Sequence, residues 1–217
     1  MEKTFSNNMP QTWTPEEFAV FDHFATLADI QAFLDDIPYS EDPIYRSPRS
    51  VLRDRKAHCF DGALFAAAAL RFFGYAPRVC EIKAVRDDGH LLALFNIDGH
   101  FGAIAKSNFS GLRFREPVFR NLRELVLSYF EDYYNVDGEK TMRGYTIPLD
   151  LSRYDSLYWM TEDAGLDVIA EKLDQIRSIS LLTPAMEARL HPMDQRSYQA
   201  GLLGVNEAGL YRPEQHH

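Results

Sequence analysis

The sequence predicts an α+β fold in which a helix that carries a cysteine packs on an antiparallel sheet, with additional N- and C-terminal helices. Two observations support this prediction. Residues 59–73 repeat apolar side chains at intervals of three and four, which is typical of a buried helix. Residues 76–85 alternate in character, and residues 90–105 predict two strands around a tight turn. The order of helices, antiparallel strands and a further helix is an α+β pattern.

The chain has 217 residues, of which 46% are hydrophobic, so it can bury a substantial core. We expect one domain over residues 1–217. It would comprise an N-terminal helical layer at 14–37, a core at 50–135, an extension at 141–190, and an irregular or tail-like end at 191–217.

Charge and hydropathy exclude several classes of partner. A net charge of −9 argues against nucleic acid and anionic membranes as main partners. The longest apolar run is too short to span a bilayer, and the N-terminal residues have no apolar core of the kind that a secretory signal needs. We therefore expect a cytoplasmic protein, and the composition leaves its oligomeric state open.

Two helix starts are expected near the N-terminus. Thr14 and Glu17 form a capping box around a proline at the first helical position, and Thr26 and Asp29 indicate a second start. The proline-rich residues 38–50 that follow are predicted to be a loop.

Cys59 stands where the central helix is expected to begin. The unpaired N–H groups of a first turn and the positive end of the helix dipole favour a thiolate there. Gly74 follows the last apolar residue and fits a left-handed helix end. The other cysteine, Cys80, lies on an alternating strand and is expected to be buried and inert. Neither belongs to a Cys-x-x-Cys repeat, which argues against a disulfide scaffold and a structural zinc site.

A nucleophilic cysteine needs a histidine as its base, and His90 is the best candidate. Asp98-Gly99 predicts a tight turn between strands at 90–97 and 100–105, so His90 begins a strand at the open end of a hairpin. A helix terminus could approach it there. His58 precedes the cysteine directly, but adjacent residues on a helix point to different faces.

The register of this hairpin nominates a partner to orient the imidazole. A two-residue turn places His90 opposite Ser107, whereas a three-residue loop places it opposite Asn108. A side-chain amide can accept the imidazole N–H. Asn108 is therefore the preferred third member, and Ser107 is the alternative.

The second half of the chain predicts more helix and one short strand. Residues 121–135 and 166–176 have the pattern of amphipathic helices. Residues 146–155 are expected to be extended and to form an edge strand, because Pro148 cannot donate to a ladder. From about His191 the periodicity is lost.

The stretch CFDGALFAAAALRFFGYAPRV is similar to the cysteine region of the transglutaminase-like superfamily. In that family a cysteine, followed two places on by an acidic residue, opens a helix that ends in Leu-Arg-x-x-Gly, and the next strand carries Ala-x-Arg-Val. These features stand here at Cys59, Asp61, Leu70-Arg71, Gly74 and Ala76–Val79. The family's next strand begins with the catalytic histidine and leads through a turn to a second strand ending in aspartate or asparagine. His90, Asp98-Gly99 and Asn108 fit that order.

The sequence also departs from the family pattern. Leu92 stands where the family often has tryptophan, and the sequence Lys-Ser-Asn at 106–108 replaces an expected Asp-Pro. The stretch GHFGAIAKSNFSGLRFREPVFR in addition resembles a bacterial subgroup of this superfamily.

The resemblance implies a papain-like cysteine hydrolase fold and a cysteine-dependent hydrolase or acyl transferase. Cys59 would attack an amide or ester of a protein, peptide or small acyl substrate, with His90 as base and Asn108 as orienting residue, and a thioester would form. No cofactor and no metal are implied. The alternative is an inactive relative whose cleft binds a peptide or small acidic ligand, as the departures and the local arginine clusters favour. A metal site at Cys59, His90 and His100 is a third interpretation, but these residues lack short ligand spacing.

Overall fold

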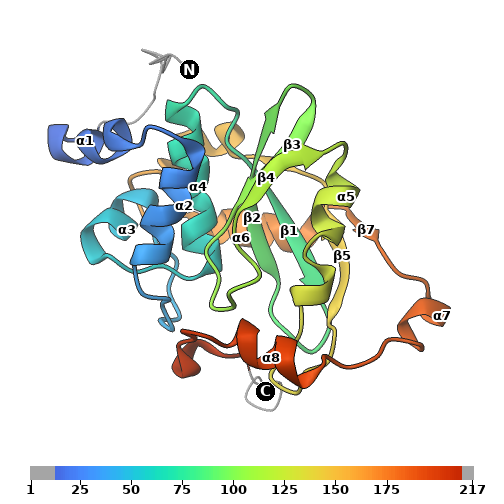
Figure 1. Ribbon diagram of the computed structural model, residues 1–217. Helices are drawn as coiled ribbons and strands as arrows, with labels where there is room; N and C mark the ends of the chain where they lie inside the picture. Colours follow the sequence, from blue (N-terminus) through green and yellow to red (C-terminus); the bar gives the residue numbers. More distant parts are fainter. Residues whose placement is uncertain (1–12, 212–217) are drawn as a thin grey trace.

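The computed structural model describes residues 13–211, in which helices pack against a seven-stranded antiparallel sheet (Figure 1). The α+β class is therefore confirmed. The strand order is β4-β3-β2-β1-β5-β7, and β6 pairs with β1 beside β5. Residues 1–12, on which the expectation about a secretory signal rests, and the last part of the predicted tail, 212–217, lie outside the described residues. No helix within residues 13–211 combines the length and apolarity that a bilayer crossing demands.

The strands are β1 (Arg78–Ala84), β2 (His90–Ile97), β3 (His100–Ile104), β4 (Arg115–Phe119), β5 (Met142–Thr146), β6 (Leu149–Asp150) and β7 (Ser178–Ser180). The α-helices are α1 (Pro15–His23), α2 (Leu27–Asp36), α3 (Pro48–Asp54), α4 (Cys59–Phe72), α5 (Leu122–Leu127), α6 (Leu166–Gln175), α7 (Pro184–Glu187) and α8 (Gln195–Gly201). Three 3₁₀ helices complete the described elements: η1 (Phe130–Asp132), η2 (Leu151–Leu157) and η3 (Glu207–Gly209).

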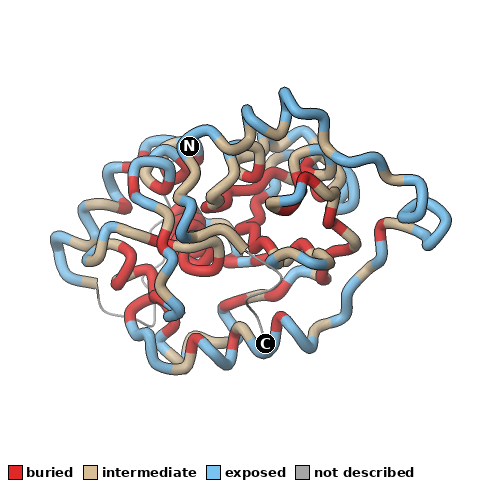
Figure 2. The backbone as a smooth tube through the Cα atoms, turned by 90° about the horizontal axis from the view of Figure 1, so that it is seen from below, coloured by how far each residue is buried: buried red, intermediate tan, exposed pale blue. Residues whose placement is uncertain are grey.

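Helix α4 is the centre of the core, and Figure 2 shows its turns buried in the middle of the molecule. Its run of alanines presents little side-chain bulk, so the helix can lie close to strand β2. The predicted start at Cys59 is confirmed. Gly74 follows with a φ of +84°, which confirms the left-handed end.

The sheet separates two apolar clusters, as the alternation of its strands predicts. On one face Leu91, Ala93 and Phe95 of β2 pack with α1, α2, α4 and α6. On the other face Leu92 and Leu94 pack with α5 and the residues that follow it. Figure 1 shows α1 to α4 on one side of the sheet and α5 on the other.

Local signals in the sequence account for several elements. The two N-terminal capping boxes are both formed, at Thr14–Glu17 and at Thr26–Asp29. The β2–β3 hairpin is also confirmed. Asp98 and Gly99 have φ values of 50° and 84°, and Ile97 lies opposite His100, so the turn has two residues.

Some predicted boundaries are wrong for local reasons. The predicted loop at 38–50 ends in α3, which Ser47 caps by accepting the N–H of Ser50 at 3.3 Å. The predicted helix at 121–135 stops at Leu127. There the Ser128 hydroxyl donates to the Leu125 carbonyl at 2.6 Å, and the chain tightens into η1.

The predicted extended segment at 146–155 is mostly helical. Only Thr146, the last residue of β5, and the short β6 are strand there, and η2 follows because the Asp150 side chain accepts the N–H of Ser152 at 3.0 Å. Strands β4, β5 and β7 were not predicted. Strand β5 lies inside the sheet, between β1 and β7.

The predicted irregular end is also wrong over the residues that the structure describes. Asp194 caps α8 by accepting the N–H groups of Arg196 and Ser197, and η3 follows it. Figure 1 shows α8 running along the lower edge of the molecule. This end of the chain reaches the candidate site.

Candidate functional site

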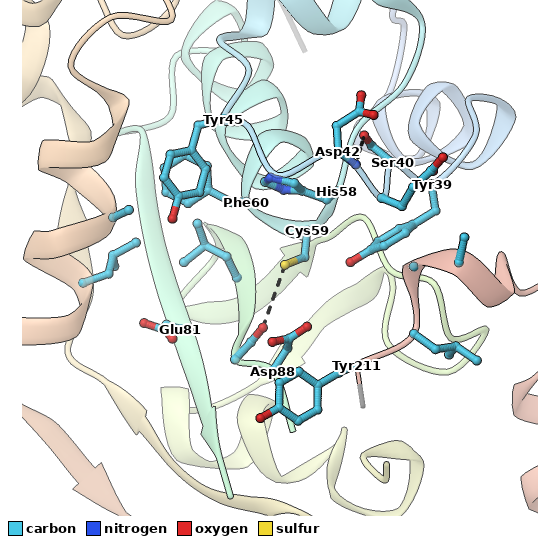
Figure 3. A pocket seen from close by; sticks show the side chains of 18 of the residues that line it. Tyr39, Ser40, Asp42, Tyr45, His58, Cys59, Phe60, Glu81, Asp88 and Tyr211 are labelled. Atoms are coloured by element: carbon cyan, nitrogen blue, oxygen red, sulfur yellow. Dashed lines mark hydrogen bonds between the residues drawn. The ribbon is translucent and has the colours of Figure 1, made fainter. Parts of the chain in front are cut away.

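Cys59 is the first residue of α4, and a reciprocal cap fixes the helix start. The His58 ring accepts the N–H of Asp61 through Nδ1 at 3.4 Å, and an Asp61 carboxylate oxygen accepts the N–H of His58 at 3.2 Å. The Cys59 sulfur donates to the Gly89 carbonyl oxygen at 3.8 Å, a long contact (Figure 3). The cap therefore holds Cys59 beside the turn that leads into β2.

Asp61 ties the helix start to the preceding loop. Its side chain is fully buried, and it accepts the backbone N–H of Arg46 at 2.7 Å. The Arg46 guanidinium lies 3.8 Å from the same carboxylate and also pairs with Asp54 at 3.1 Å and with Asp42. Burial raises the pKa of Asp61 to about 7. Asp61, the acidic residue two places after the cysteine in the motif, thus anchors the helix start to the loop.

Cys59 borders an open cleft of about 490 Å³. The loop before α3, the start of α4, strand β1, helix α6 and the C-terminal segment supply its walls. Five acidic residues line it: Glu41, Asp42, Glu81, Asp88 and Asp174. No lysine or arginine is among the described residues that line this cleft. Cations outside the lining pair with three of these carboxylates: Arg46 and Lys56 pair with Asp42, and Lys83 pairs with Glu81 and Asp174. The cleft is therefore acidic but partly neutralised.

A narrow recess of about 50 Å³ continues inward from this cleft. Cys59, His90, Ser107 and Asn108 all line it, so the candidates that the sequence nominated for acyl chemistry border one space. Cys59 and His90 reach it from different sides, since the described hydrogen bonds of the thiol and the imidazole go to the Gly89 and Leu112 carbonyls. Cys59 stands at the junction, because it lines both spaces.

His90 is buried at the start of β2, opposite Ile82, on the sheet face that α5 covers. Its Nε2 lies 2.8 Å from the Leu112 carbonyl oxygen, and its ring packs edge-on against Tyr133. A carbonyl only accepts, so this contact assigns the proton to Nε2 and the lone pair to Nδ1. Burial lowers the pKa of His90 to about 4, so the imidazole is neutral at pH 7.

The expected hydrogen bond from the His90 ring N–H to the Asn108 amide oxygen is not made. The Asn108 amide instead donates to the Asn206 carbonyl oxygen and accepts the Asn206 N–H, both at 2.8 Å. Ser107 accepts the N–H of Phe109 at 3.0 Å. The register argument fails because β3 ends at Ile104, before either residue can pair with His90. The Leu112 carbonyl orients the ring instead.

The expected lowering of the Cys59 pKa is wrong. Burial, reinforced by the charges of Asp88 and Asp61, raises the pKa of this thiol to about 12. Desolvation and two nearby carboxylates outweigh the helix terminus. Cys80 is buried on β1 as predicted, its sulfur donating to the Thr146 carbonyl at 3.2 Å, and burial raises its pKa to about 12 as well.

Tyr39 is a site residue that the sequence did not reveal. Figure 3 shows its hydroxyl pointing toward the Cys59 sulfur, and a hydrogen bond from this hydroxyl acts to lower the pKa of the thiol. A bridge to Ala57 holds its backbone. Tyr39 lies in the proline-rich loop and is half-buried, and no periodicity in that loop marks it as part of a site.

The metal interpretation finds no support. His100 lies in the exposed hairpin turn, at the opposite end of β2 from His90, and its Nδ1 contacts the Asp98 carbonyl at 3.1 Å. Across residues 13–211, no three histidine, cysteine or acidic side chains are grouped to hold a metal ion.

Comparisons with protein families and with curated proteins identify no relative of this chain. No protein-family model matches the sequence, and no curated protein matches it at a significant level. The site itself must therefore carry the argument about function.

Proposed function

We propose that the protein is a cysteine-dependent hydrolase or acyl transferase with a transglutaminase-like arrangement of helix and sheet. Cys59 is the nucleophile and His90 is the base. One observation carries the proposal. The thiol lies at a helix N-terminus, where an open cleft meets the recess that contains the imidazole.

The resting state is an uncharged pair, because the Cys59 pKa is raised to about 12 and the His90 pKa is lowered to about 4. His90 would therefore act as a general base at the moment of attack, through the lone pair on Nδ1. The thiol proton passes to the imidazole, the sulfur bonds to the carbonyl carbon, and the carbonyl electron pair moves to oxygen. Collapse expels an amine or alcohol, which takes that proton and leaves a thioester. Water or an acceptor then releases the acyl group.

Two donors could turn to the oxygen of the tetrahedral intermediate, although in the resting structure the Cys59 N–H donates to the Tyr39 hydroxyl and that hydroxyl bonds to the Cys59 sulfur. The backbone N–H of Cys59 belongs to the first turn of α4, whose N–H groups have no partner within the helix. The second donor is the Tyr39 hydroxyl, which points toward the Cys59 sulfur. Together they form a candidate oxyanion hole.

The charge of the cleft favours a neutral or cationic substrate. Its lining holds five carboxylates and no lysine or arginine among the described residues, although Arg46, Lys56 and Lys83 pair with three of the carboxylates. Most of the arginines that suggested an acidic ligand lie elsewhere. Arg115, for example, stacks on Tyr129 and pairs with Asp132 at 3.4 Å on the other side of the sheet. An acidic ligand is therefore a poor candidate.

The second candidate function is a binding module that uses the same cleft. Two observations favour it: the raised pKa of the Cys59 thiol, and the engagement of Asn108 by Asn206 in place of His90. In this case the cleft holds a neutral or cationic peptide without turnover.

Intact-protein mass spectrometry distinguishes the two functions. The wild-type chain and its Cys80→Ser control should gain an acyl group from activated esters, thioesters or glutamine amides. The Cys59→Ser and His90→Ala chains should not. The double variant should lose little more than either single one, since groups that act as a unit are not additive. If no substrate forms a Cys59-dependent adduct, even on a variant in which Cys59 is shown to be accessible, the enzyme proposal fails and the binding module stands.

A further inference from the structure

The C-terminal residues 206–211 run across the mouth of the site. Ala208, Gly209, Leu210 and Tyr211 line the outer cleft, and Gly209 and Tyr211 also line the inner recess. Figure 3 shows Tyr211 close to Asp88, on the side of the cleft that faces the Cys59 sulfur. The segment therefore forms a wall of both spaces that Cys59 borders.

Asn206 clamps this segment to two separate walls. Its backbone N–H and carbonyl hold the Asn108 amide at 2.8 Å each, on the loop after β3. Its side-chain amide donates to the Tyr39 carbonyl and to the Glu41 carboxylate, each at 3.1 Å, on the loop before α3. One residue thus bridges the cleft from side to side.

The contacts of Asn206 also fix the side chain of Asn108, which the sequence nominated to orient the His90 ring. Both hydrogen-bonding atoms of the Asn108 side chain contact Asn206, which fixes the amide toward the segment rather than toward the His90 ring.

No residue of 206–211 is fully buried, and the ring contact upstream joins Tyr198 to Tyr134 with centroids 5.5 Å apart. Neither α8 nor η3 has a buried residue, and Leu203 between them is 82% exposed. The anchors upstream are hydrogen bonds, such as that from the Ser110 N–H to the Gly201 carbonyl at 3.1 Å and that from the Tyr198 hydroxyl to the Val136 carbonyl at 2.6 Å. Segments held in this way open at low free-energy cost.

We propose that residues 206–211 are an autoinhibitory strap that narrows access to the partly exposed Cys59 and opens by releasing the Asn206 clamp. Opening widens the path of solvent and substrate to the thiol and frees the Asn108 amide from Asn206. The proposal concerns access to Cys59, so it can be tested whether or not the protein transfers acyl groups.

The rate at which iodoacetamide alkylates Cys59 tests the strap, and buried Cys80 in the same chain is the internal control. Two full-length variants open the strap by different means. Asn206→Asp places a carboxylate against the Glu41 carboxylate and the Tyr39 carbonyl. Gly209→Leu adds a side chain whose Cβ would lie only 2.9 Å from the Tyr39 ring. Glu207→Gln, at the exposed position next to the clamp, is the matched control.

Both opening variants should raise the rate of Cys59 alkylation about tenfold or more, which is the effect of losing a pair of hydrogen bonds. The alkylation rate of Cys80, and both rates in Glu207→Gln, should stay unchanged. An unchanged rate in both variants overturns the proposal. So does a fall, because Asn206 would then support the site rather than close it. A rise shared by Cys80 reports loosening of the whole fold and also counts against the strap.

Discussion

Replacing Asp61 by asparagine should remove a pH dependence from the stability of the fold. Asp61 is fully buried at the start of α4, where its carboxylate accepts the N–H groups of Arg46 and His58. Burial raises its pKa from 3.8 to about 7. The folded protein therefore binds a proton at Asp61 more tightly than the unfolded chain does.

The sign and size of the effect follow from that difference. Between roughly pH 4 and pH 7 the folded state keeps a proton that the unfolded chain has already released, so stability falls as the pH rises. A shift of about three pKa units corresponds to roughly 4 kcal/mol over the whole range. Asparagine keeps an acceptor oxygen but has no proton to release. The stability of Asp61→Asn relative to wild type should therefore improve by roughly 2 kcal/mol between pH 5 and pH 7.

Urea unfolding at these two pH values, followed by the fluorescence of buried Trp159, measures the difference. Asp54→Asn is a control of opposite sign, because hydrogen bonds from Arg53 and Arg46 lower the pKa of Asp54. Its carboxylate stabilises the fold above the unfolded pKa, so this variant should be weakened at both pH values. If the unfolding free energy of Asp61→Asn minus that of wild type stays constant or falls between pH 5 and pH 7, the reasoning is refuted.

Three further substitutions probe the site. His90→Phe should reduce the loss of Tm on acidification, because burial lowers the pKa of His90 to about 4 and stability is lost as pH falls from about 6.5 through that value; an equal loss in both proteins contradicts it. Gly62→Ala should lower the urea midpoint, since its Cβ would lie 2.2 Å from that of Lys106. Overpacking costs about 3 kcal/mol against about 1 kcal/mol of gained helix propensity, and an unchanged midpoint would show that the two segments separate freely. Tyr39→Phe should slow alkylation of Cys59, because it removes a hydrogen bond that lowers the thiol pKa; an identical pH–rate profile contradicts that contact.

The sequence by itself determined the parts of this protein that depend on neighbours a few positions apart. The capping boxes at Thr14 and Thr26, the helix that starts at Cys59 and the turn at Asp98-Gly99 all follow from contacts within one turn or one hairpin. Apolar periodicity then distinguished helix from strand and indicated the α+β class. Cys59 and His90 could be nominated on these grounds, since each stands at the first residue of such an element.

The chemistry of the site was decided by contacts that local pattern does not encode. The partner of the His90 ring is a carbonyl 22 residues away, and the partner of Asn108 is 98 residues away, on a segment without periodicity. Tyr39 reaches the thiol from a loop. The thiol pKa depends on a balance between the helix terminus, which is local, and desolvation with the charges of Asp88 and Asp61, of which desolvation is the largest. Desolvation arises only once distant segments have packed around the cysteine, and for that reason only the tertiary structure could decide whether the thiol pKa is raised or lowered.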